Sequence, residues 1–324
     1  MPKADPAARG SSVPRRLGAD RHAEKRPVAA RLPPRLGVPA LVALSCLFAG
    51  NHIAARLAFD HGASVAAGVV MRSGVTALAM LALIGIGGVS LAIPRQTLVR
   101  GLAVGLLVAI QSYCLYSAVA EIPVALALLA FNTYPLFFML LTWALGGGRP
   151  AARALAAVPL AFAGMVLALD VVGSVETLGG RWGEIGTGVS WALGGSAAFT
   201  IALHLTMQHL QELDGRIRTM LAMGVTAIAV AAFGAAGGGL ELPVDGIGWV
   251  GLVLATVLYG SAISAVFLIV PRLAEASNTA ALNFEPVAAI GLGWVILGQQ
   301  IAPIQLVGAA VIVGALMLLG ARRG

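Results

Sequence analysis

Long apolar segments recur along almost the whole chain, and they constrain its fold more than any other feature. A helix needs roughly 20 apolar residues to cross the hydrocarbon core of a bilayer. Short connections rich in glycine, proline and charge separate ten such segments: 37–57, 64–88, 98–118, 122–145, 152–172, 185–208, 217–236, 247–270, 277–297 and 303–320. The pattern predicts an all-α polytopic membrane protein with ten transmembrane helices.

The low content of charged residues supports this prediction. Only 11% of the 324 residues are charged and 59% are hydrophobic, whereas soluble domains carry about 25% charged residues. The chain therefore cannot cover a surface that faces water, and we expect the lipid bilayer to surround it. The net charge of +7 does not indicate a nucleic-acid partner, because nine of the 21 basic residues lie within the first 35 positions.

The distribution of basic residues predicts the orientation. Residues 1–36 are rich in proline, arginine and alanine, which is typical of a disordered, basic cytosolic tail. With this tail in the cytosol, 18 basic residues lie on the cytosolic side and only Arg56 and Arg181 on the other, while Arg72 lies inside the second span. The positive-inside rule then predicts a bacterial-type inner (plasma) membrane protein with both termini in the cytoplasm.

Two stretches of the chain resemble each other and indicate an internal repeat. They are "LAFNTYPLFFMLLTWALG" (129–146) and "ALNFEPVAAIGLGWVILG" (281–298). An offset of about 151 positions aligns identical residue types: Asn132 with Asn283, and Pro135 with Pro286. We therefore expect two five-helix copies, residues 37–172 and residues 181–321.

Because five is an odd number of spans, the second copy should be inverted relative to the first. Inverted repeats are typical of secondary carriers, whose substrate site lies near the bilayer midplane at the repeat interface. The sequence thus predicts two inverted five-helix repeats around a central cavity.

The paired prolines, Pro135 and Pro286, are candidate hinges. A proline inside a helix removes one backbone hydrogen bond, and lipid cannot satisfy the carbonyl that is left free. These helices should therefore face protein or a water-filled cavity at that depth. The alternative is that both prolines only bend their helices for packing.

These features together resemble the ten-helix EamA-type transporters of the drug/metabolite transporter superfamily. The doubled proline segments carry most of the resemblance, which covers about residues 37–321. Further matching motifs are "AGNHIAARLA" (49–58), "VMRSG" (70–74) and "PRLAEASNTAAL" (271–282). The resemblance implies a basket of helices around a central cavity and export of small metabolites, with aromatic and other neutral amino acids a frequent substrate class. The chain departs from the family in having "GGGR" and "GQQI" where Gly-Glu often ends helices 4 and 9, so no role of that glutamate carries over.

Polar and amphipathic residues within the predicted cavity helices are candidate substrate contacts. Any one of them could instead be an interhelical hydrogen-bonding residue, worth roughly 0.6–2 kcal/mol. The candidates are Asn51, His52, Gln111, Tyr113, Asn132, Trp191, Tyr259, Asn278, Asn283 and Glu285.

Glu285 is the most informative candidate, because an ionisable group inside a span is costly and is a functional candidate by default. Three roles remain open for it: a proton-carrying carboxylate, a binding group for a substrate ammonium, and one half of a structural ion pair with Arg72. Helical spacing slightly favours a shared polar stripe of Asn278 and Glu285, with Asn283 on another face.

Missing motifs narrow the function further. The sequence has no GxxxxGK[ST] motif for ATP and no Gly-x-Ser-x-Gly or HExxH motif for hydrolysis. We therefore expect no enzyme activity, no cofactor and no metal. The overall prediction is a secondary transporter that exports a small-molecule substrate, an amino acid or a similar metabolite, by alternating access. A membrane enzyme acting on a lipid-linked substrate, a channel, and an uptake carrier or facilitator are the alternatives. A monomer and a homodimer are both compatible with the sequence.

Overall fold

A computed structural model describes residues 34–150, 178–269, 285–299 and 302–320, together with isolated residues between 152 and 167. Within these ranges the protein contains helices and no strand. The helices are α1 (Pro34–Asp60), α2 (Val65–Ile86), α3 (Arg95–Glu121), α4 (Val124–Phe131), α5 (Tyr134–Ala144), α7 (Leu178–His209), α8 (Gly215–Phe233), α9 (Gly246–Ile269), α10 (Glu285–Leu297) and α11 (Pro303–Gly320). A π-helical turn, η2 (Gly234–Gly238), continues α8.

Seven of the described spans are long and apolar enough to cross a membrane. They are contributed by α1, α2, α3, α4 with α5, α7, α8 and α9, while α10 and α11 hold shorter apolar stretches. The protein is therefore an α-helical membrane protein with several spans, as predicted. The predicted helix 152–172 and the first half of the predicted helix 277–297 lie largely outside the described residues, as do residues 1–33 of the predicted tail.

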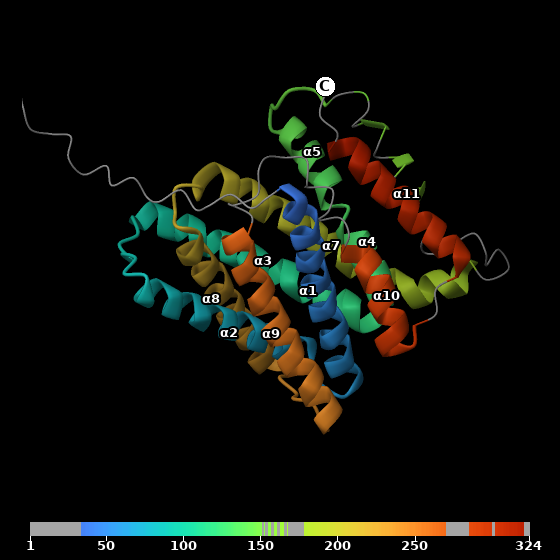
Figure 1. Cartoon of the computed structure of the whole chain (residues 1–324), viewed down its shortest axis with the longest axis horizontal. Helices are drawn as coiled ribbons and strands as arrows, with labels where there is room; N and C mark the ends of the chain where they lie inside the picture. Colours follow the sequence, from blue (N-terminus) through green and yellow to red (C-terminus); the bar gives the residue numbers. More distant parts are fainter. Residues whose placement is uncertain are drawn as a thin grey trace, which may run out of the picture.

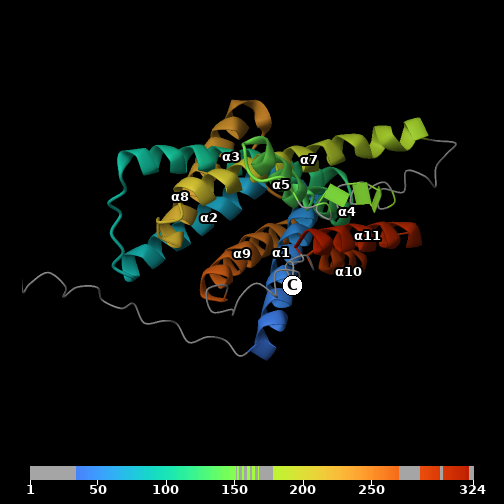
Figure 2. The same ribbon diagram turned by 90° about the horizontal axis from the view of Figure 1, so that it is seen from above.

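Helices from the two halves of the chain pack against one another throughout the molecule. In Figure 1 and Figure 2, α1 and α9 lie side by side, with α2, α3 and α8 on one side of them and α10 and α11 on the other. The packing pairs that join the halves are α1 with α9, α3 with α7, α2 with α8, α2 with α9, α3 with α8, α1 with α10, α4 and α5 with α7, and α4 with α10.

The span that carries Pro135 is discontinuous. Helix α4 ends at Phe131 and α5 begins at Tyr134, so Pro135 lies in the first turn of α5 rather than inside a continuous helix. Its missing N–H costs little in that position. The predicted disturbance at Pro135 is therefore present, and it takes the form of a break that begins before the proline.

Polar side chains bind the backbone carbonyls around this break. Thr133 Oγ1 donates to the Ala130 carbonyl at 2.7 Å, and Thr200 Oγ1 of α7 donates to the Tyr134 carbonyl at 3.2 Å. Such bonds matter because lipid cannot satisfy the polar groups of irregular backbone at membrane depth. The break is thus held against α7.

A main-chain clasp closes one end of the bundle, between the α1–α2 connection and the segment that precedes α9. The Ser64 N–H donates to the Glu241 carbonyl at 2.9 Å, and the Val244 N–H donates to the His61 carbonyl at 3.0 Å. The His61 Nδ1 atom lies 2.7 Å from the Asp245 carboxylate. This clasp joins the two halves of the chain outside the candidate spans.

Candidate functional site

Tyr116 of α3 lies at the centre of the candidate site, and it is completely buried. Its hydroxyl donates to Asn51 Oδ1 at 2.7 Å. The His52 ring meets it edge-on, with centroids 5.7 Å apart, and the Arg72 guanidinium carbon lies 4.5 Å from its centroid. We call Asn51, His52, Arg72 and Tyr116 the Tyr116 cluster; it joins α1, α2 and α3.

Arg72 is buried in the cluster with only 3% of its surface exposed. Its guanidinium carbon also lies 4.0 Å from the centroid of the Tyr259 ring of α9, and Nη2 donates to Ser112 Oγ at 2.9 Å. Two aromatic faces on one cation partly offset its desolvation, by about 2 kcal/mol or more for a desolvated contact. Arg72 is therefore held by two rings and a hydroxyl.

Glu285 pairs with His52 and not with Arg72 among the described residues. Its Oε1 atom lies 3.4 Å from His52 Nε2, and the carboxylate side chain is 21% exposed. The pair connects α1 to the first turn of α10. This contact differs from the pair with Arg72 that the sequence suggested, and all three roles of Glu285 remain predictions.

Several buried polar atoms of the cluster have no hydrogen-bond partner within the described part of the chain. They are Asn51 Nδ2, His52 Nδ1, Arg72 Nε and the neighbouring Ser73 Oγ. A buried polar group without a partner costs about 1–3 kcal/mol, and buried polar groups in native proteins nearly always have one. Such a group of atoms is a suitable place for a polar ligand or water.

A second set of candidates surrounds Tyr113. Its ring contacts those of Trp191, at 6.2 Å between centroids, and Phe233, at 5.2 Å. The Trp191 Nε1–H donates to Glu121 Oε1 at 3.2 Å. These contacts place Tyr113 and Trp191 in an aromatic group between α3, α7 and the end of α8.

Gln111 and Tyr259 adjoin the Tyr116 cluster through Arg72. Gln111 Oε1 accepts from Ser112 Oγ at 3.5 Å, and Ser112 in turn accepts from Arg72. The Tyr259 hydroxyl points to the Met223 sulfur, at 3.6 Å. Both predicted candidates therefore lie close to the buried cation.

Of the remaining candidates, only Asn132 and the two prolines lie among the described residues. Asn132 is buried, and its Nδ2 donates to the Leu128 carbonyl of its own span at 2.8 Å. Asn278 and Asn283 lie outside the described residues. Pro286 is the second residue of α10, and since residues 281–284 are also outside the description, its hinge role stays a prediction.

Tyr116 and Ser112 were not among the residues predicted from the sequence. Tyr116 follows Tyr113 by three residues on the same helix, and this spacing could have made it a candidate as well. Nothing local indicates that Tyr116 binds Asn51, which is 65 positions away. Arg72 was interpreted as a residue that snorkels or pairs, with Glu285 as one possible partner, and not as a candidate substrate contact.

Comparison with known proteins identifies the fold but no family. No protein-family model and no curated protein matches the chain. Twenty-one chains of solved structures match it. One of them, a crystal structure, is 18% identical with a TM-score of 0.54, and the match covers 89% of this chain and 98% of that chain. At this identity the likeness shows a shared fold alone.

Proposed function

We propose that the protein is a secondary transporter that exports small organic metabolites, with neutral or aromatic amino acids as the leading class. It would act by alternating access in a bacterial-type inner membrane, with both termini cytoplasmic. The EamA-type resemblance of the doubled proline segments supports this choice, and carrier action needs no catalytic machinery.

The observation that carries the proposal is the pattern of helix packing. The proposed repeat pairs α1 with α7, α2 with α8, α3 with α9, and α4–α5 with α10. When each helix is replaced by its counterpart, every packing pair that joins the halves becomes another observed pair or stays the same pair. The contact of α1 with α9 maps onto that of α7 with α3, and the contact of α2 with α8 maps onto itself. Two inverted repeats of a carrier would pack in this way around one central site.

Helix endings support the same correspondence. Helix α5 ends before Gly146, which has a φ of +89°, and α10 ends before Gly298, which has a φ of +64°. Glycine adopts this left-handed conformation at little cost, and helices commonly end on it. The two helices that the repeat pairs together thus end alike.

The proposal is tested by untargeted mass spectrometry of spent medium from cells that express the wild type, Glu285→Gln, Glu212→Gln or an empty vector. Glu212 is exposed beyond the end of α7, so its substitution is a matched control. Metabolites enriched by the wild type and the control variant would identify the substrates.

Loss of enrichment in Glu285→Gln alone would assign Glu285 to binding or coupling. No enrichment from a correctly inserted wild type would contradict export. Depletion of a medium component would then favour uptake, and a newly formed lipid product would favour a membrane enzyme.

A further inference from the structure

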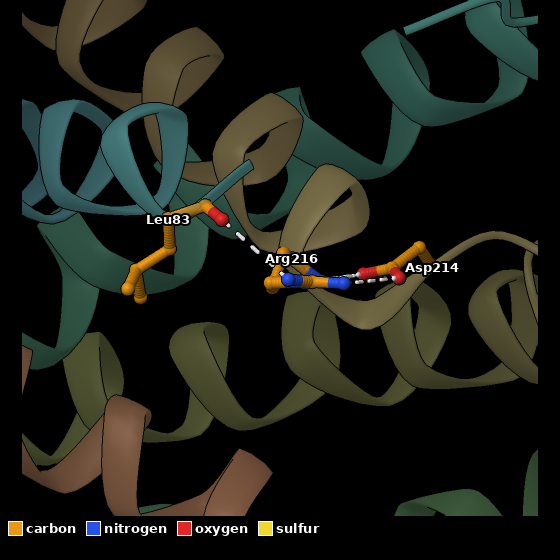
Figure 3. Close-up of polar contacts among 3 residues, drawn as sticks. All are labelled: Leu83, Asp214 and Arg216. Atoms are coloured by element: carbon orange, nitrogen blue, oxygen red, sulfur yellow. Dashed lines mark hydrogen bonds and ion pairs between the residues drawn. The ribbon is translucent and has the colours of Figure 1, made fainter. Parts of the chain in front are cut away.

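Two arginines of this protein have very different surroundings. Figure 3 shows Arg216 at the start of α8, where Nε and Nη2 donate to the Asp214 carboxylate at 3.2 and 3.1 Å and Nη1 to the Leu83 carbonyl at 3.5 Å. Within the described residues, Arg72 donates one hydrogen bond, from Nη2 to Ser112 Oγ, and none of the carboxylates there lies within ion-pair distance of it. In the same part of the chain, Arg216 is paired with a carboxylate and Arg72 is not.

A cation at this position without a carboxylate partner among the described residues is expensive. An arginine near the centre of a transmembrane helix costs roughly 2.5–3.5 kcal/mol on insertion scales. The rings of Tyr116 and Tyr259 reduce this cost, but they carry no negative charge and accept no hydrogen bond from Nε in the plane of the guanidinium. The site retains both a charge and a donor that an anion would complement.

The same tyrosine brings a second unused donor to this place. Asn51 is completely buried, its Oδ1 is occupied by the Tyr116 hydroxyl, and its Nδ2 has no partner among the described residues. With Oδ1 accepting from Tyr116, Nδ2 is the atom of the amide that has no partner among the described residues, and it offers a ligand an N–H donor. Arg72 and Asn51 both contact Tyr116, and neither Arg72 Nε nor Asn51 Nδ2 has an acceptor within the described part of the chain.

A carboxylate fits this set of donors. It has two oxygens with about four acceptor positions, and a planar guanidinium matches its geometry. Charge-assisted bonds of this kind are about twice as strong as neutral ones. Glu285 Oε1 lies 3.4 Å from His52 Nε2, so a second carboxylate on the same ligand that reached this edge of the cluster would meet a like charge.

We propose that Arg72 and Asn51 form a subsite for the carboxylate of a small monocarboxylate substrate, an inference that rests on the proposed transport function. Tyr116 positions both residues and does not itself contact the ligand through its hydroxyl. The subsite narrows the substrates to compounds that carry one carboxylate, amino acids among them, and excludes organic amines that have none.

The test is thermal unfolding of the purified full-length protein in detergent with matched probes. The probes are acetate, L-alanine and L-phenylalanine, each compared with its amide, which keeps the shape and removes the charge. We expect at least one carboxylate to raise the melting temperature in a saturable manner while its amide does not. A wild type that no carboxylate stabilises beyond its amide overturns the subsite.

Variants assign the effect to these residues. Arg72→Gln should abolish the difference between carboxylate and amide, and Arg72→Lys should weaken its affinity at least tenfold. Arg216→Gln is the matched control and should leave the difference unchanged. If Arg72→Gln does not fold, Asn51→Asp provides the test, because it replaces the Nδ2 donor by a carboxylate oxygen that repels a substrate carboxylate, while preserving the acceptor for Tyr116. Unchanged carboxylate binding in Arg72→Gln, or in Asn51→Asp, overturns the proposal.

Transport is measured separately, in the spent medium of cells that express the same variants. Selective carboxylate binding without any export would retain the subsite and remove the carrier function. Export without any difference between carboxylate and amide would retain the carrier and remove the subsite.

Discussion

At the scale of single residues, the hydrogen bond between Tyr116 and Asn51 organises the candidate site. It fixes the orientation of the Asn51 amide, so that Nδ2 is the atom left for a ligand, and it holds the ring against which Arg72 lies. Both partners are completely buried, so neither can exchange this bond for one with water.

Tyr116→Phe should therefore destabilise the fold although it removes a single atom. It leaves Asn51 Oδ1 buried without its donor, and such a loss costs about 1–3 kcal/mol. The measurement is thermal unfolding in detergent. Tyr113→Phe is the matched control, because no described hydrogen bond involves the Tyr113 hydroxyl. Equal stability of Tyr116→Phe and the wild type would contradict the role given to this bond.

At the scale of helices, close backbone contact between α1 and α9 depends on Gly251. A Cβ atom at this position would lie 2.8 Å from the Ala54 carbonyl oxygen and 2.8 Å from the Ala58 nitrogen. Both are main-chain atoms of a helix and cannot move aside individually. The two helices can approach this closely only because residue 251 has no side chain.

Gly251→Ala should separate α1 from α9 and destabilise the protein by about 1–3 kcal/mol, as overpacking does elsewhere. Gly260→Ala in the same helix is the control, because its Cβ would lie 3.9 Å from Thr76 Oγ1, an ordinary contact. Thermal unfolding of both variants measures the difference. A Gly251→Ala variant as stable as Gly260→Ala would contradict the packing.

Helices α5 and α10, which carry Pro135 and Pro286 in their first turns, give the functional prediction at this scale. Pro135→Ala should allow α4 and α5 to approach one continuous helix, and Pro286→Ala should stiffen the start of α10 if it acts as the second hinge. Each variant should transport at least several-fold more slowly while inserting normally, as judged by its amount in the membrane fraction. Normal transport by well-inserted variants would assign both prolines to packing alone.

Elements were easier to predict from the sequence than contacts. Span length and apolarity are local properties, and they located α2, α3, α8 and α9 to within a few residues. Pro135 indicated the disturbed span, but the break begins three residues earlier, at Asn132, and Thr133 and Thr200 bind backbone carbonyls around it. The sequence suggested Arg72 as a possible partner of Glu285, whereas among the described residues Glu285 contacts His52. The two residues are 233 positions apart, and only the packing of α1 on α10 brings them together.

At the scale of the whole molecule, the clasp includes an ion pair that responds to pH. The Asp245 carboxylate accepts from the Gly248 N–H at 2.8 Å and contacts His61 Nδ1. The Gly248 bond foremost, and then His61, lower the pKa of Asp245 below its ordinary value. A lowered pKa in the folded state stabilises the fold above the ordinary value, and this contribution is lost as pH falls through the folded pKa.

The wild type should accordingly lose part of its stability below about pH 4, where carboxylates protonate. Asp245→Asn should lack this part of the pH dependence. His61→Gln should keep most of it, because the Gly248 bond is the larger cause. Unfolding temperatures measured from pH 7 to pH 3 compare the three proteins; identical pH profiles would show that the carboxylate does not stabilise the clasp.

The clasp also has a consequence for the tolerance of this region to substitution. Two of its bonds join main-chain groups, at Ser64 with Glu241 and at Val244 with His61. Replacing side chains leaves such bonds in place, whereas insertions, deletions or a proline at a donor position break them. Related chains should therefore keep the lengths of these two connections nearly constant, while residue type varies where no side-chain bond or positive φ constrains it, unlike at Asp245 and Gly62.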